Sequence, residues 1–236
     1  MQSTFTRQEL KFIIDRSTFG ALMRELPKHT EPDKHNKNHR PYPIYSIYFD
    51  TPDSDLARMS FDKERYYRYK IRVRSYHDFT DQQEQVFLEI KKKVNGISNK
   101  RRIRLPYHEA LVFIKNGTLP APSPHINPQI VREMQHYFAS KHLQSTTHVT
   151  YNRYAFTGEP NLRITLDTDV VATNYSDHLP QKLLKDGQYI LEIKARGAMP
   201  LWLAHWLSAH HIFEHSFSKY GKSYINKLRK ESLQYV

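Results

Sequence analysis

Short segments that recur along this chain alternate charged and apolar residues with a period of two. In the clearest, RYKIRVR at residues 68–74, cations occupy every second position and Tyr69, Ile71 and Val73 occupy the others. Since residues i and i+2 of a β-strand share a face, this segment predicts a strand with one apolar and one cationic face. Adjacent like charges repel, so a sheet that collects them on one face is typical of a protein that binds a polyanion.

The overall charge also favours an anionic partner. The chain has 36 Lys and Arg against 24 Asp and Glu, and its formal net charge is +12. Such a balance fits nucleic acid, a membrane surface or phosphorylated molecules. The lack of cysteine excludes disulfides and thiolate chemistry. We find no signal-peptide core and no apolar run long enough to span a membrane, so we expect a cytoplasmic protein.

The hydrophobic pattern divides the chain into alternating strand and helix regions. Strands are predicted at residues 5–14, 44–50, 65–76, 86–94, 100–105, 149–156, 161–171 and 189–196. Helices are predicted at residues 17–26, 107–115, 128–142, 200–211 and 220–233. Ser17 and Asn127 are the expected N-caps, Pro128 the first residue of its helix, and Asn95-Gly96 a hairpin turn.

Two proline-containing stretches, residues 27–41 and 118–128, are predicted to be loops. The strands after the second loop repeat the charge pattern of the strands before it. We therefore expect a single domain over residues 1–236. Strands of this kind, about eight in number, predict an α+β fold: a closed antiparallel β-barrel, or tunnel, with helices packed outside. A linear phosphate chain is thin and anionic throughout, so it would suit a narrow cationic barrel.

Four acids on the charged faces constrain the chemistry further: Glu9, Glu89, Asp167 and Glu192. A carboxylate in a phosphate site repels the ligand unless a metal ion lies between them. Mg²⁺ and Mn²⁺ prefer carboxylate and phosphate oxygens as ligands. The mixture of acids and cations therefore indicates a metal-assisted phosphoryl site, and cross-strand salt bridges are the alternative explanation.

Ordered motifs along almost the whole chain are those of a known family. They are RQELKF (7–12), YFDT (48–51), KIRVRSY (70–76), LEIKKK (88–93), YNRYAF (151–156), RITLD (163–167), LEIK (191–194) and FSKY (217–220). In these motifs the chain resembles the VTC domain, the polyphosphate polymerase branch of the triphosphate tunnel metalloenzymes. The hydrolase relatives begin with Glu-x-Glu-x-Lys; here the first position is Arg7, which favours the polymerase branch.

The resemblance implies an enzyme that transfers the γ-phosphate of ATP to a growing inorganic polyphosphate chain, with Mn²⁺ or Mg²⁺ as cofactor. The expected partners are ATP or another triphosphate, polyphosphate, and pyrophosphate or phosphate. By the family pattern, the tunnel residues that hold phosphates are Lys11, Arg72, Arg74, Lys91, Lys100, Arg153 and Arg163. Glu192 is the expected metal ligand, aided by Glu9 or Glu89, and Ser218 and Lys219 close on phosphate at one end. The charged strand faces add Arg7, Lys70, Lys93, Arg102 and Lys194 as phosphate-binding candidates.

Other functions stay open at this point. The same site would be a triphosphatase if water were the acceptor, and a sensor if it bound polyphosphate without turnover. Basic strands interleaved with tyrosines could also stack nucleic-acid bases, but carboxylates on the same faces would repel a nucleic-acid backbone. We therefore expect no nucleic-acid partner. The sequence leaves the oligomeric state open.

Overall fold

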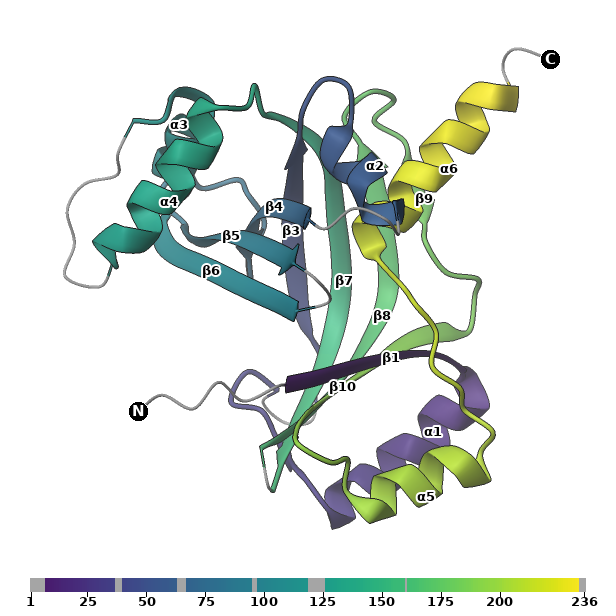
Figure 1. Ribbon diagram of the computed structural model, residues 1–236. Coiled ribbons are helices and arrows are strands. Elements are labelled where there is room, and N and C mark those ends of the chain that lie inside the picture. Colours follow the sequence, from purple (N-terminus) through teal and green to yellow (C-terminus); the bar gives the residue numbers. More distant parts are fainter. Residues whose placement is uncertain are drawn as a thin grey trace. The chain divides into compact units, whose positions relative to one another are not determined.

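The computed structural model describes residues 7–36, 40–62, 67–94, 97–118, 126–159 and 161–233, without the side chains of residues 7, 8, 97 and 98. The chain forms two compact units that interleave in sequence. Unit 1 comprises residues 1–43, 151–170 and 182–218, and unit 2 comprises residues 44–150, 171–181 and 219–236. Two long strands, β7 (Gln144–Gly158) and β8 (Leu162–Asn174), contribute residues to both units (Figure 1).

Unit 1 is organised around β10 (Gln188–Arg196), which pairs antiparallel with β1 (Arg7–Asp15) and with β8. Helices α1 (Arg16–Glu25) and α5 (Leu201–Ala209) lie side by side (Figure 1). Their buried leucines pack against apolar residues of the strands in one core cluster. The predicted loop at residues 27–41 contains the 3-10 turn η1 (Leu26–Lys28) at its start and the short strand β2 (Glu31–Pro32), which pairs with β7.

The first helix begins earlier than the sequence predicts. The Asp15 carboxylate accepts hydrogen bonds from the Thr18 backbone N–H at 2.8 Å and from the Ser17 hydroxyl at 2.8 Å. These bonds, the Thr18 backbone bond first, lower the pKa of Asp15 to about 2. The prediction of Ser17 as the N-cap is therefore wrong, because the carboxylate two residues earlier takes that role.

Unit 2 contains a meander of four antiparallel strands: β3 (Tyr42–Asp50), β4 (Tyr67–Ser75), β5 (Gln85–Val94) and β6 (Ile97–Pro106). Helices α3 (Tyr107–Asn116) and α4 (Pro128–Ala139) join one core cluster with the apolar side chains of these strands (Figure 1). The predicted cap of α4 is confirmed, since the Asn127 side chain accepts from the Gln129 N–H at 2.9 Å and Pro128 is the first helical residue. Helices α2 (Asp55–Phe61) and α6 (Lys219–Leu233) complete the unit.

Within the described ranges, the strand order is β1-β10-β8-β7-β3-β4-β5-β6, with β2 beside β7 and β9 (Pro180–Lys182) beside β8. The predicted α+β class with a large antiparallel sheet is confirmed. Strand β7 begins five residues before its predicted start, at Gln144 rather than Val149, because residues 144–148 carry mostly polar side chains that give no alternation signal. The Asn95-Gly96 turn and residues 119–125 of the predicted loop lie outside the described residues.

The helices of the described ranges are all too short or too polar to cross a membrane.

Candidate functional site

One face of the sheet β4-β5-β6 carries rows of lysine and arginine side chains. Residues opposite each other in neighbouring strands share a face, and Lys70, Lys91 and Lys100 lie opposite one another across the three strands. The next row along the strands is Arg72, Glu89 and Arg102. We call this surface the cationic face, and its cations are Arg68, Lys70, Arg72, Arg74, Lys91, Lys93, Lys100, Arg102 and Arg104.

The opposite face of these strands is apolar and belongs to the core. Ile71, Val73 and Leu88 are fully buried there. Arg101, one residue after Lys100, lies on this side, where its guanidinium donates to Glu133 of α4 at 3.0 Å. The alternation along β6 therefore separates Lys100 from Arg101 as the sequence predicts.

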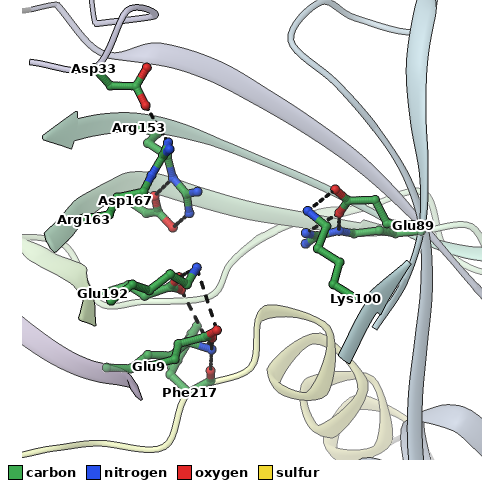
Figure 2. A network of polar contacts seen from close by, with 12 residues as sticks. Glu9, Asp33, Glu89, Lys100, Arg153, Arg163, Asp167, Glu192 and Phe217 are labelled. Atoms are coloured by element: carbon green, nitrogen blue, oxygen red, sulfur yellow. Dashed lines mark hydrogen bonds and ion pairs between the residues drawn. The ribbon is translucent and has the colours of Figure 1, made fainter. Parts of the chain in front are cut away.

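Glu89 is the acid of the cationic face. Its side chain is 2% exposed and accepts from Arg72 Nε at 2.7 Å, and Arg72 Nη2 lies 2.6 Å from the same oxygen. Lys100 Nζ lies 2.5 Å from the other carboxylate oxygen (Figure 2). Burial opposes the ionisation of Glu89, but Arg72, Arg74 and Lys100 outweigh burial and hold its pKa well below the ordinary value. Three cations around one carboxylate leave an excess of positive charge.

The pKa of Lys100 is also shifted by these neighbours. Burial lowers the pKa of its ammonium to about 8, and the attraction of Glu89 offsets burial only in part. Arg72 and Arg74 lower this pKa further by repulsion. Lys100 is therefore a cation that titrates close to neutral pH.

A second cluster lies in unit 1, where β1 and β10 pair. Glu9 is opposite Lys194, and Lys11 is opposite Glu192. The Lys11 ammonium lies 3.2 Å from Glu9 and 4.0 Å from Glu192. The Lys194 ammonium lies 3.8 Å from Glu9 and forms a close ion pair with Glu192 (Figure 2). Two ammonium groups thus bridge two carboxylates.

Glu192 is strongly held in its ionised form. It is 8% exposed, and burial alone would raise its pKa. Lys194, Arg153 and Lys11 reverse that effect and keep its pKa well below the ordinary value. Glu192 therefore stays ionised over the whole physiological pH range.

Two arginines predicted to hold phosphate are engaged by acids in unit 1. Arg153 of β7 donates to Asp167 of β8 in a bidentate pair, with distances of 2.6 and 2.8 Å (Figure 2). Both side chains are buried, and Asp167 has no exposed surface. Burial disfavours the charge of Arg153, but the Asp167 carboxylate keeps its pKa above the ordinary value. Arg163 lies 2.7 Å from the buried carboxylate of Asp33.

Asp33 was not predicted as a site residue, because residues 27–41 have the composition of a loop. Its backbone N–H donates to the Ala155 carbonyl at 2.8 Å, and Asn36 accepts from the Ala155 N–H at 3.1 Å. These bonds fix Asp33 beside β7. The sequence around Asp33 carries no signal for this site, since its burial and its contact with Arg163 depend on residues far away in the chain.

The carboxylates fit a divalent metal in unit 1. Glu9 and Glu192 share two ammonium groups, so both carboxylates already bind positive charge in the ligand-free molecule. Mg²⁺ typically binds one or two carboxylates and completes its shell with phosphate oxygens and water. Among the side chains that the structure describes, no three His, Asp or Glu residues are grouped for metal binding. Glu89, the third predicted ligand, belongs to unit 2 and is paired with Arg72 and Lys100.

The other predicted site residues lie on β1, on the segment before α6 and at the start of α6. The Lys11 ammonium donates to the Phe217 carbonyl at 3.4 Å, and the Lys11 carbonyl accepts from the His215 N–H at 2.7 Å. These bonds tie the segment before Ser218 to β1. Lys219 is the first residue of α6. Arg7 is the first residue of β1, and its side chain lies outside the described part.

Solved structures share this fold. A candidate adenylate cyclase from Bacillus halodurans is 14% identical, with a TM-score of 0.54 over 90% of this chain and 95% of that chain. A candidate adenylyl cyclase from Hippeastrum, described as having a dominant triphosphatase activity, is 15% identical. Its TM-score is 0.56 over 90% of this chain and 92% of that chain. No curated protein matches the chain significantly in sequence.

The family model of the VTC domain matches residues 6–226, which is nearly the whole chain. This match agrees with the ordered motifs and with the shared fold. The chain belongs to the VTC domain family.

Proposed function

We propose that this protein is a metal-dependent polyphosphate polymerase, which transfers the γ-phosphate of ATP to the end of an inorganic polyphosphate chain. Its family and fold support the broader assignment, an enzyme that acts on triphosphates. The cationic face is the main observation that supports the polymerase proposal. Its rows of cations repeat along the strands with a single carboxylate, Glu89, among them, and this regularity suits a repetitive polyanion.

In this proposal the cationic face binds and orients the phosphates. Arg72 and Arg74 supply guanidinium groups that can bind phosphate oxygens through two parallel bonds, while Lys70, Lys91 and Lys100 add point charges. Glu89 and Tyr48 orient the Arg72 guanidinium in the ligand-free molecule, and phosphate oxygens would compete with them for its N–H groups.

Glu9 and Glu192 would hold the divalent metal, Mn²⁺ or Mg²⁺. When bound, the metal would neutralise charge on the phosphoryl group in transfer. Lys11 and Lys194 would move from their carboxylate partners toward phosphate oxygens. Arg153, fixed by Asp167, contributes a permanent positive charge that keeps Glu192 ionised.

The acceptor decides between two activities of this site. The terminal phosphate of a growing chain is already a nucleophile, so the polymerase needs no general base. If water reaches the same phosphoryl group, the product is free phosphate and the protein is a triphosphatase. The triphosphatase activity described for the Hippeastrum protein makes this the second candidate.

The test is an incubation of the purified protein with ATP and Mn²⁺ or Mg²⁺. Products are resolved on a polyacrylamide gel stained for polyphosphate, and free phosphate is assayed in parallel. A ladder of long chains supports the polymerase. If free phosphate forms without a ladder, the protein is a triphosphatase and the polymerase proposal is wrong. If the protein binds tripolyphosphate but forms neither product, it is a binding protein. The matched variants are Arg72→Ala on the cationic face and Arg101→Ala on the opposite face.

Lys100 predicts a pH dependence of phosphate binding. Its pKa is about 8, so it is charged below pH 8 and loses its charge as the pH rises above that value. We expect the tripolyphosphate affinity of the wild type to fall between pH 7 and pH 9 relative to Lys100→Arg, by about five- to tenfold. Isothermal titration calorimetry at pH 7, 8 and 9 measures this ratio. Tripolyphosphate itself becomes more negative as the pH rises, and this effect is the same for both proteins, so the ratio of their affinities removes it. Parallel pH profiles of the two proteins would contradict the assignment of the pH dependence to Lys100.

A further inference from the structure

Asp50, at the end of β3, is a buried carboxylate with several donors. It has no exposed surface. One oxygen accepts from the N–H groups of Thr51 and Leu56 at 2.7 and 2.8 Å, and the other from the N–H of Ala57 at 2.9 Å. The carboxylate thereby caps α2, whose own N-cap residue, Ser54, has a positive φ of 59° and no side-chain cap bond.

Tyr220 uses the same carboxylate to anchor α6. Its hydroxyl donates to Asp50 at 2.6 Å, and the residue is 3% exposed. Burial and the charge of Asp50 raise the pKa of this hydroxyl, so it stays a donor. Tyr220 is the second residue of α6, directly after Lys219. One turn later, the Ser223 hydroxyl donates to the buried Asn174 side chain at 3.0 Å.

The ring of Tyr220 connects this anchor to the cationic face. It stacks on the ring of Tyr48, with centroids 4.8 Å apart and an angle of 6° between the planes. The Tyr48 hydroxyl accepts from Arg72 Nη1 at 3.2 Å. Arg72 is therefore held on one side by Glu89 and on the other by a tyrosine that rests on the first turn of α6.

We infer that Tyr220 is a positioning residue, which holds Lys219 in place for phosphate binding through its hydrogen bond to Asp50. The inference rests on the proposed function and on the family pattern, by which Lys219 would contact phosphate. A lysine at the start of a helix has a long flexible side chain, and the first turn of a helix frays unless it is anchored. The buried Asp50–Tyr220 bond keeps the first turn of α6 from fraying directly next to Lys219. Loss of the bond would release the first turn, while the Tyr48 stack and the remaining caps of α2 stay in place.

The test is a double-mutant cycle between Tyr220→Phe and Lys219→Ala in the full chain, with Tyr224→Phe as the matched control. Tyr224 lies one turn further along α6, where its ring stacks near Phe61. The dissociation constant for tripolyphosphate is measured by calorimetry, together with the binding stoichiometry and the melting temperature. We expect Tyr220→Phe to weaken binding about tenfold at unchanged stoichiometry, because it removes a hydrogen bond to a buried charge. The double variant should bind as weakly as Lys219→Ala alone.

The possible outcomes separate this inference from the proposed function. If Lys219→Ala weakens binding but Tyr220→Phe does not, or if the two losses multiply, the inference is wrong and the proposed function stands. If Tyr220→Phe lowers only the stoichiometry and the melting temperature, its role is structural and the inference is again wrong. If the wild type does not bind tripolyphosphate, both are wrong.

Discussion

Replacing Glu192 by glutamine should lower metal-dependent turnover of ATP by at least about 100-fold. The substitution keeps the shape of the side chain and removes the charge that Lys194, Arg153 and Lys11 hold in place. A neutral amide is a poor ligand for a hard divalent cation, so the metal affinity should fall as well. Initial rates with ATP and Mn²⁺ give the first quantity, and Mn²⁺ binding followed by electron paramagnetic resonance gives the second.

The matched control is Glu133→Gln. Glu133 also pairs with a basic residue, Arg101, but its side chain is 46% exposed on α4. The Glu133→Gln variant should keep the ATP turnover and the Mn²⁺ affinity of the wild type. Full turnover and unchanged Mn²⁺ binding in Glu192→Gln would remove Glu192 from the metal site, whatever reaction the protein catalyses.

The second large effect is on stability. Replacing Asp167 by alanine should lower the free energy of unfolding by about 3–5 kcal/mol, because it leaves the buried guanidinium of Arg153 without its bidentate partner. The double variant Arg153→Met/Asp167→Leu should recover most of this loss, since apolar side chains can fill a buried ion-pair site. Urea denaturation, followed by circular dichroism, measures all three proteins.

Asp186→Ala serves as the control for an exposed ion pair. Asp186 pairs with Lys182 at 2.6 Å, but its side chain is 83% exposed. The change in the free energy of unfolding should be too small to resolve by urea denaturation, because solvent screens an exposed ion pair. A similarly small effect for Asp167→Ala would mean that water or another group compensates Arg153, and the stability argument for this pair would fail.

The period-two alternation predicted the longer strands and their charged faces, but it missed the short strands β2 and β9 and the start of β7. It separates Lys100 from Arg101, and it brings Lys70, Lys91 and Lys100 onto one face without any knowledge of the pairing. The turn predicted at Asn95-Gly96 implies that β5 and β6 are neighbours, and the structure pairs them antiparallel. The register of β4, β5 and β6 was not predicted. The assignment of the individual side chains to catalysis, and of residues 1–236 to one domain, remains a prediction.

Contacts between residues far apart in sequence could not be predicted. Asp50 and Tyr220 are separated by 170 positions, and each has an ordinary local explanation, the end of a strand and the start of a helix. Asp33 lies in a polar stretch that resembles a loop. The acids of the charged faces were assigned to a metal or to salt bridges; Glu9, Glu89, Asp167 and Glu192 all pair with cations in the ligand-free molecule, which is compatible with either role.

The cationic face also links folding to the chemical environment. Its charges repel one another only when the strands are paired, so the folded meander carries an electrostatic cost that the unfolded chain largely avoids. A polyanion that binds this face binds the folded state, and at 100 times its dissociation constant it would stabilise that state by about 2.7 kcal/mol. The protein would then be most resistant to unfolding and proteolysis where polyanions that bind this face are abundant.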